Sequence, residues 1–305
     1  MESSDIKIKI YVVCHKSTYV PHERSLYPIQ VGSAKSAFRL DGMLYDDSGE
    51  DNISNLNQDY CELTALYWAW KNDNSDYVGL FHYRRFIALN TVALRKQLDW
   101  WKHYYRETAL TDDFIRKIGF TGDESGIISS YDIIVPQCSD LNYRNVGSFY
   151  ELYKGYQREL DHALNLLVKK YPEYESAIDK CKAGNKGYHS NMFIMKRNLF
   201  EEYCAWIFSI LSQMERDKFT TNKKRLLGYI AEFLTGIFFV KKLEEGYRIK
   251  EFPCVFFKYT DGKHHKIYSF FNCLLSSIFR HVIPLGSKRE SLLYAITDVL
   301  RGIKY

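Results

Sequence analysis

The chain has 305 residues, of which 46% are hydrophobic and 16% aromatic, and its formal net charge is +5. This composition excludes a disordered protein, and the length suffices for one large α/β domain with an extension. Basic residues are scattered until the last forty positions, so the sequence shows no nucleic-acid footprint. The seven cysteines include no CxxC pair, which indicates reduced thiols rather than disulfides or a zinc finger.

The first residues do not have the pattern of a signal peptide, because their apolar stretch is short and alternates with lysine. No run reaches the roughly 20 apolar residues that a membrane span needs. We therefore expect a cytoplasmic protein.

Two short strands are predicted near the start of the chain, at residues 6–13 and 27–31. The first ends next to His15, and the second ends at Gly32, where a ligand can approach the backbone closely. Residues 39–56 are acidic and polar and predict a mobile loop, in which Asp46 and Asp47 are interpreted as ordinary loop acids.

Residues 51–86, DNISNLNQDYCELTALYWAWKNDNSDYVGLFHYRRF, predict a capped helix, a polar turn and a buried strand. Asn57 is the expected N-cap, and Glu62 places negative charge near the helix start. The strand ends in His82-Tyr83-Arg84-Arg85. Because ligands of open α/β sheets bind beyond the carboxyl ends of strands, two arginines there suit an anion site. The alternative is a surface ion pair with an acidic neighbour.

The rest of the chain continues to alternate between strand and helix patterns. In order, it predicts irregular helices at 90–125, a strand at 131–136, an amphipathic helix at 148–170, a short helix opened by Pro172, a loop leading to His189, Ser190 and Asn191, a strand at 192–195, helices at 198–215 and 224–243, and a strand pair at 247–257 broken at Pro253. Glu232 is the only acid before Glu244 on the strongly apolar helix at 224–243, so it lies at a polar edge or in a site.

Residues 266–305 mix apolar stripes with lysine and arginine. This pattern predicts a basic amphipathic helical extension, separate from a first domain at 1–265. It fits either a membrane-surface element or a terminal helix packed on the domain with solvated charges.

The sequence contains no HExxH, Walker A, GxGxxG or GxSxG motif. This argues against a zinc-protease site, the classical nucleotide-binding loops and a serine-hydrolase site. What remains is the layout of a GT-A nucleotide-sugar transferase. In that class the strand after the first helical crossover normally ends in Asp-x-Asp, which holds a divalent metal on the diphosphate. Here it ends in His82, Arg84 and Arg85, and guanidinium groups bind a diphosphate bidentately. We therefore favour donor binding without a metal cofactor, with Mn²⁺ or Mg²⁺ left open.

Several segments resemble, in the same order, a bacterial family of capsular and exopolysaccharide glycosyltransferases that was long catalogued as a domain of unknown function. They are IKIYVVCHK, YPIQVG, DNISNLNQDYCELTALYWAWKN, DYVGLFHYRRF, YDIIVP and NMFIMKRNLFEEYCAWIF. Some members of that family are galactofuranosyltransferases. The resemblance implies a GT-A-like single Rossmann-type domain with a mixed sheet, a UDP-sugar donor, a lipid-linked glycan acceptor at the inner membrane face, and an inverting reaction in capsule or O-antigen biosynthesis.

The resemblance also implies roles for individual residues. Those expected to bind the donor are His15, Gly32, Asn57, Glu62, His82, Arg84 and Arg85. His189 and Asn191 would border the acceptor, and Glu232 would be the catalytic base. Glu232 lies in Ala-Glu-Phe-Leu, where a Ser-Glu-Arg-Leu-like stretch is expected, so the arginine that would orient it is missing.

Each of these roles has a plainer alternative. Glu232 fits a helix-edge acid paired with Lys223, and His189 fits an ordinary hydrogen-bonded histidine. Capping and the helix dipole alone would explain Asn57 and Glu62. For the whole chain the rivals are a non-catalytic glycan- or nucleotide-binding module and a basic nucleic-acid-binding protein.

Overall fold

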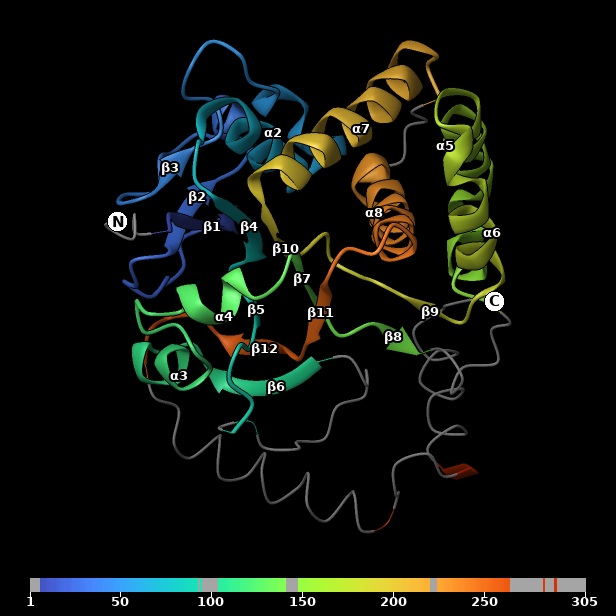
Figure 1. The fold of residues 1–305 in the computed structure, drawn as a ribbon. Coiled ribbons are helices and arrows are strands. Elements are labelled where there is room, and N and C mark those ends of the chain that lie inside the picture. Colours follow the sequence, from blue (N-terminus) through green and yellow to red (C-terminus); the bar gives the residue numbers. More distant parts are fainter. Residues whose placement is uncertain are drawn as a thin grey trace, which may run out of the picture.

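A mixed ten-stranded sheet organises the chain (Figure 1). The structure is a computed structural model that describes residues 6–92, 94, 104–140, 148–219, 224–263, 282 and 288–289. The main strands are β1 (Ile8–Cys14), β2 (Leu26–Gln30), β3 (Leu44–Tyr45), β4 (Tyr77–His82), β7 (Ile133–Pro136), β10 (Phe193–Lys196) and β11 (Ile249–Phe252). They lie side by side in the order β11-β7-β10-β4-β1-β2-β3.

Strand direction decides where side chains converge. β1 is parallel to both β2 and β4, whereas β10 is antiparallel to both β4 and β7. Val13 of β1 pairs with His82 of β4, and Cys14 of β1 pairs with Gln30 of β2. The carboxyl ends of β1, β2 and β4 therefore meet at one edge of the sheet, as the sequence predicts.

A side branch of the sheet begins directly after β4. β5 (Arg85–Ile87) turns back on β4, with His82 paired to Arg85, and then pairs with β12 (Cys254–Tyr259). β6 (Tyr104–Ala109) runs parallel to β12. This reversal keeps Arg84 and Arg85 at the same edge as His82.

Helices cover both faces of the sheet. They are α1 (Asn57–Tyr60), α2 (Leu63–Asn72), α3 (Asp112–Lys117), α4 (Ser125–Ser129), α5 (Gln157–Lys170), α6 (Glu175–Ala183), α7 (Arg197–Arg216) and α8 (Leu226–Glu244), with 3-10 turns η1 (Ser33–Lys35), η2 (Ser54–Leu56), η3 (Tyr150–Tyr156) and η4 (Pro172–Tyr174). A separate pair of short strands, β8 (Ser139–Asp140) and β9 (Lys186–Gly187), lies apart from the main sheet.

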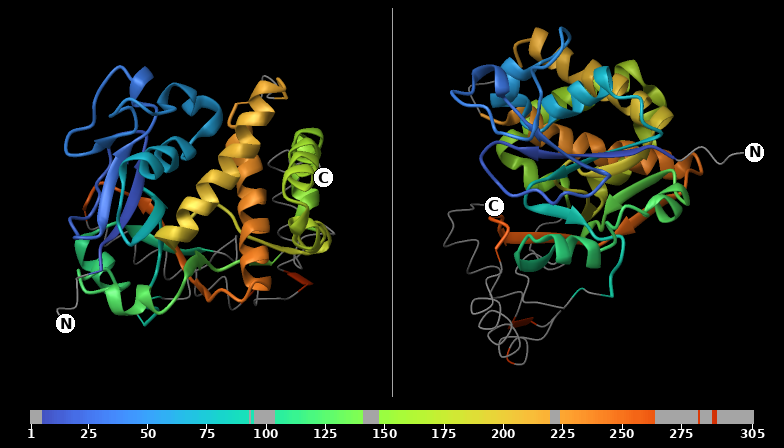
Figure 2. Two further views of the ribbon diagram at one scale, coloured as in Figure 1. Left: turned by 45° about the horizontal axis from the view of Figure 1, so that its top comes forward. Right: turned by 90° about the vertical axis from the view of Figure 1, so that its left-hand side faces the viewer.

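Two hydrophobic cores result. α2, α5, α6, α7 and α8 pack on one face of the sheet, and α3 and α4 pack on the other (Figures 1 and 2). β1 shows the period of two that this requires, since Tyr11 and Val13 enter the first core while Ile10 and Val12 enter the second. Burial on both faces explains the apolar runs of β1 and β4 in the sequence.

Three sequence predictions about local structure are wrong. The region 90–125 is not helical throughout, because residues 104–109 form β6 by pairing with the distant β12. Asn57 is not an N-cap: its backbone is already helical, with φ −55°, and the helix breaks at Cys61, where φ is 52°. Asp46 is not an ordinary loop acid, because it is completely buried.

The remaining predicted strands and helices are found with small shifts of boundary, including a kink at Tyr153 before α5 and the break at Pro253. The extension at 266–305 lies outside the described residues except at positions 282, 288 and 289, so its boundary stays a prediction. Within the described part of the chain, no helix is both long and apolar enough to cross a bilayer.

Candidate functional site

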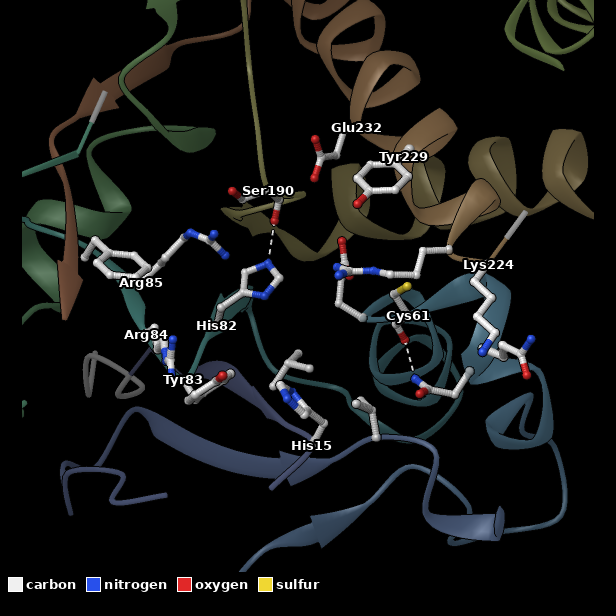
Figure 3. A pocket seen from close by; sticks show the side chains of 17 residues that line it. His15, Cys61, His82, Tyr83, Arg84, Arg85, Ser190, Lys224, Tyr229 and Glu232 are labelled. Atoms are coloured by element: carbon white, nitrogen blue, oxygen red, sulfur yellow. Dashed lines mark hydrogen bonds between the residues drawn. The ribbon is translucent and has the colours of Figure 1, made fainter. Parts of the chain in front are cut away.

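A cavity of about 670 Å³ opens at the edge where β1, β2 and β4 end and α8 begins. Seven of the ten residues singled out from the sequence line it: His15, Asn57, Glu62, His82, Arg84, Arg85 and Glu232. In Figure 3, Arg84 and Arg85 lie on the strand side of the cavity, while Tyr229 and Glu232 project from α8. The topology thus brings together residues that are up to 217 positions apart, from His15 to Glu232.

The two arginines are held by aromatic faces. The Arg84 guanidinium lies 5.2 Å from the ring centre of Tyr83, and that of Arg85 lies 5.6 Å from the ring centre of Phe256. No acidic side chain among the described residues forms an ion pair with Arg84, and its buried Nε has no hydrogen-bond partner there. A buried donor of this kind is normally satisfied in native structures, so Arg84 is poised to bind an anion.

His82 is fixed in one tautomer. Its Nε2 lies 2.6 Å from the carbonyl oxygen of Ser190, which can only accept, so Nε2 carries the proton and Nδ1 keeps its lone pair. Burial lowers the pKa of His82, although Glu62 and Glu232 raise it and Arg85 lowers it. His82 therefore enters the site as a neutral imidazole, and the positive charge of this wall comes from the arginines.

His15 lies beside this wall, with its ring 5.1 Å from that of Tyr83. Burial lowers the pKa of His15, and the neighbouring cations Lys16, Arg225 and Arg84 lower it further. Arg225, directly before α8, and Arg84, on the strand wall, therefore both lie near the imidazole of His15.

Asn191 does not line the cavity but supports a residue that does. It is buried, and its Nδ2 donates to Oε1 of Glu62 at 2.7 Å and to the carbonyl of Gly228 at 3.2 Å. Thr235 donates to its Oδ1 at 3.1 Å. Ser190 and Asn191 both have positive φ, 78° and 47°, a strained conformation that these bonds hold in place.

Glu232 lies on the cavity side of α8 with 20% of its side chain exposed, and its Oε2 is 3.8 Å from Nδ1 of His189. His189 does not line the cavity itself, and its ring packs 4.9 Å from Phe149. The alternative partner Lys223 lies outside the described residues. Gly32 is also set back from the cavity, directly behind Asn57.

Several residues that line the cavity are not among those predicted from the sequence, notably Cys61, Lys224, Arg225 and Tyr229. Arg225 precedes α8 with a φ of 66°, and its backbone N–H donates to Gln58 at 3.0 Å. Its guanidinium lies 5.5 Å from the ring centre of Tyr229. One sequence feature could have identified Lys224 and Arg225 as site residues. They are basic and directly precede a helix, where the helix dipole favours acidic residues.

Cys61 is a poor nucleophile in this setting, because burial raises the pKa of its thiol to about 11. In the described part of the chain, no three His, Cys, Asp or Glu side chains are grouped as metal ligands. The ionisable groups that line the cavity include guanidinium groups, a lysine amine, two imidazoles and two carboxylates.

An α/β fold with a cationic cavity at the carboxyl edge of its parallel strands is typical of nucleotide-binding enzymes. Residues 9–243 match the family model of a domain of unknown function, DUF4422, and the chain belongs to that family. The fold is similar to the apo structure of the WbbM bifunctional glycosyltransferase, with a TM-score of 0.77 and 30% identity over 85% of this chain and 47% of that chain. No curated protein matches the sequence.

These comparisons confirm the family recognised from the sequence and its GT-A-like α/β fold. The chain spans about half the length of the solved glycosyltransferase that it resembles.

Proposed function

We propose that this chain is a glycosyltransferase that moves a sugar from a UDP-sugar to a glycan acceptor. The observation that carries the proposal is a single cavity lined by Arg84 and Arg85 on one wall and by Glu232 on the other. The similarity of this chain to a solved glycosyltransferase supports the same class of reaction.

In the proposed donor complex, Arg84 and Arg85 bind the diphosphate. Guanidinium groups neutralise this group with bidentate, charge-assisted hydrogen bonds. Lys224 and Arg225 add positive charge from the opposite wall. We propose that these groups replace the metal ion of other GT-A enzymes, because β4 ends in basic residues where paired carboxylates would bind the metal.

In the proposed reaction, an acceptor hydroxyl attacks the anomeric carbon of the donor sugar as Glu232 takes the hydroxyl proton. The bond between that carbon and the diphosphate oxygen breaks, and the electron pair leaves with UDP. Arg84 and Arg85 stabilise the negative charge that develops on the leaving group. An attack from the face opposite to UDP inverts the anomeric configuration.

The identity of the substrates rests on the family resemblance. We propose galactofuranose as the sugar, and a lipid-linked glycan of capsule, O-antigen or exopolysaccharide biosynthesis as the acceptor. The basic residues of 266–305 would hold the enzyme at the membrane surface where such an acceptor is anchored.

The test measures UDP release from a panel of UDP-sugars, including UDP-galactofuranose, in three parallel series: without additive, with EDTA, and with Mn²⁺ restored after EDTA. Glu232→Gln should lower kcat by about 10²- to 10⁴-fold, because it removes the general base but keeps the shape of the side chain. UDP affinity should stay within a few fold of wild type.

Glu244→Gln is the matched control, since Glu244 lies on the same helix but pairs with Lys180 outside the cavity. Donor binding without turnover would favour the non-catalytic binding module. Activity that vanishes in EDTA and returns with Mn²⁺ would overturn the metal-independent reading.

A further inference from the structure

Glu62 is a buried carboxylate with one oxygen available to a ligand. The residue is only 7% exposed and lines the cavity directly before α2. Its Oε1 accepts a hydrogen bond from Nδ2 of Asn191 at 2.7 Å. No residue that the structure describes donates to Oε2 or forms an ion pair with Glu62, and Oε2 is not enclosed by protein atoms as the Nε of Arg84 is. Oε2 is therefore accessible from the cavity.

Asn191 sets the orientation of this carboxylate. Its Nδ2 donates to Oε1 of Glu62 and to the carbonyl of Gly228 at 3.2 Å. Both partners only accept, so the amide of Asn191 cannot turn its own oxygen towards them without losing both bonds. Asn191 is buried and does not line the cavity. It therefore holds Oε1 away from the cavity and leaves Oε2 as the oxygen that a ligand can reach.

Nδ1 of His82 is a second acceptor close to Glu62. Nε2 of His82 donates to the carbonyl of Ser190, so Nδ1 carries the lone pair, and no residue in the described part of the chain donates to it. Glu62 has the largest effect of any charged group on the pKa of His82, which it raises, so the two side chains are neighbours. Ser190 and Asn191 thus each hold one acceptor, and their positive φ values mark strain of the kind that clusters at binding sites.

These two acceptors require a ligand group that donates. The oxygens of a diphosphate only accept, and a carboxylate repels them, so the diphosphate suits the arginines instead. Sugar hydroxyls donate, and a UDP-sugar carries them on the ribose and on the transferred sugar. Glu232, the proposed base, also raises the pKa of His82. His82 therefore lies towards the reacting side of the cavity, which favours the transferred sugar over the ribose.

We propose that Oε2 of Glu62, together with Nδ1 of His82, accepts hydrogen bonds from hydroxyls of the transferred sugar, and that Glu62 determines which donor sugars bind. This inference rests on the proposed function, since it places a UDP-sugar in the cavity. It divides the cavity into a basic part for the diphosphate and an acceptor part for the sugar. A donor without the hydroxyl that faces Glu62 would leave a buried carboxylate oxygen without a partner and would bind more weakly.

The experiment measures the dissociation constants of UDP and UDP-galactofuranose by calorimetry, without acceptor, for the full-length protein and Glu62→Gln. Glutamine keeps an oxygen for Asn191 and places an N–H donor where the carboxylate oxygen faced the cavity. The lost negative charge affects the diphosphate of both ligands alike, so the ratio of the two constants isolates the sugar.

This ratio should shift against UDP-galactofuranose by about tenfold in Glu62→Gln, because a charged hydrogen bond is replaced by a neutral one. Glu244→Gln, outside the cavity, should keep the wild-type ratio. If Glu62→Gln weakened UDP and UDP-galactofuranose by the same factor, the inference would be overturned, because the ribose or the fold would then be the cause.

Donor analogues test the same bond in wild type, in case Glu62→Gln does not fold. Fluorine cannot donate a hydrogen bond, so among UDP-galactofuranose analogues with one hydroxyl replaced by fluorine, at least one should bind about tenfold more weakly. That analogue should lose less affinity in Glu62→Gln, since the two changes remove the same bond.

The possible failures are distinguishable. If every fluorinated analogue binds wild type as UDP-galactofuranose does, the inference is overturned while the proposed function stands. If wild type binds UDP but not UDP-galactofuranose, the inference falls together with the proposed sugar. If wild type binds neither ligand, the proposed function falls as well.

Discussion

At the scale of single residues, buried polar groups differ in whether they have hydrogen-bond partners. The buried Nε of Arg84 in the cavity has none among the described residues, whereas the carboxylate of Asp132 has several. Lys196 Nζ lies 2.5 Å from Oδ1, and the backbone N–H of Arg248 donates to Oδ2 at 2.8 Å. Burial alone would raise the pKa of Asp132, but these bonds outweigh it and lower the pKa from 3.8 to about 2.

The lowered pKa of Asp132 predicts how the stability of the fold depends on pH. Because the folded pKa is depressed, the interaction stabilises the fold above about pH 4 and is lost as the pH falls through 2. Asp132→Asn should therefore reduce the free energy of unfolding at pH 7 by roughly 2 kcal/mol. Urea titrations at several pH values should show the difference from wild type shrinking below pH 4.

Asp113→Asn is the control for this experiment. Asp113 pairs with Arg116 at 3.1 Å, but 65% of its side chain is exposed, so the change should cost less than about 0.5 kcal/mol. If Asp132→Asn lowered the free energy of unfolding by the same amount at every pH, the lowered pKa of Asp132 would not be the cause.

At this scale, a local sequence pattern singled out some of the residues that line the cavity, while their roles stay predictions. Arg84 and Arg85 stand out because they follow an apolar strand, and the structure places them in the cavity. Asp46 does not stand out, because its role depends on donors from Gly32 and Thr64 that only the folded chain brings near. No spacing in the sequence indicates that these three residues come into contact.

At the scale of elements, β4 is confined between two neighbours. A Cβ added at Gly79 would lie 2.9 Å from Cγ1 of Ile10 on β1 and 3.2 Å from Cγ1 of Ile194 on β10. Both isoleucines are fully buried, so neither side chain has space to move aside.

Gly79→Ala should therefore reduce the free energy of unfolding by about 1–3 kcal/mol, as overpacking of a core does. Thermal or urea unfolding measures this directly. Gly126→Ala is the matched control, because nothing lies within 4 Å of the new Cβ in α4, and alanine should stabilise that helix by up to about 1 kcal/mol. An equal effect at the two positions would contradict this account of the packing.

The elements were largely predictable, because burial on both faces leaves continuous apolar runs and amphipathic helices leave a period of 3.6. The failures have physical causes. β6 forms only because β12, about 150 positions later, pairs with it, and the helix that starts at Asn57 breaks at Cys61 in a conformation that non-glycine residues rarely adopt. Both are decided by tertiary contacts rather than by local propensity.

At the scale of the whole molecule, the sheet edge and α8 together form a cavity with basic groups on two walls. Residues 266–305 add further lysines and arginines, and we propose that they bind an anionic membrane. Replacing Arg280, Lys288, Arg289 and Arg301 by glutamine should weaken binding to vesicles that contain anionic lipid by about 10³-fold, at about 1 kcal/mol per charge.

Vesicle co-sedimentation measures that change, and UDP affinity, measured in parallel, serves as the internal control for a folded cavity. Unchanged sedimentation of the variant would show that the basic extension is not a membrane-binding element.

The central claim, that paired arginines at the end of β4 bind a nucleoside diphosphate, is tested most directly by calorimetric titration of UDP into wild type and the double variant Arg84→Gln/Arg85→Gln. We predict one UDP site in wild type and at least about a hundredfold weaker binding in the double variant, since each charged hydrogen bond contributes about 1.5–3 kcal/mol. Arg39→Gln, which removes a surface ion pair with Asp47, should bind UDP as wild type does. Equal UDP affinity in wild type and the double variant would contradict the account.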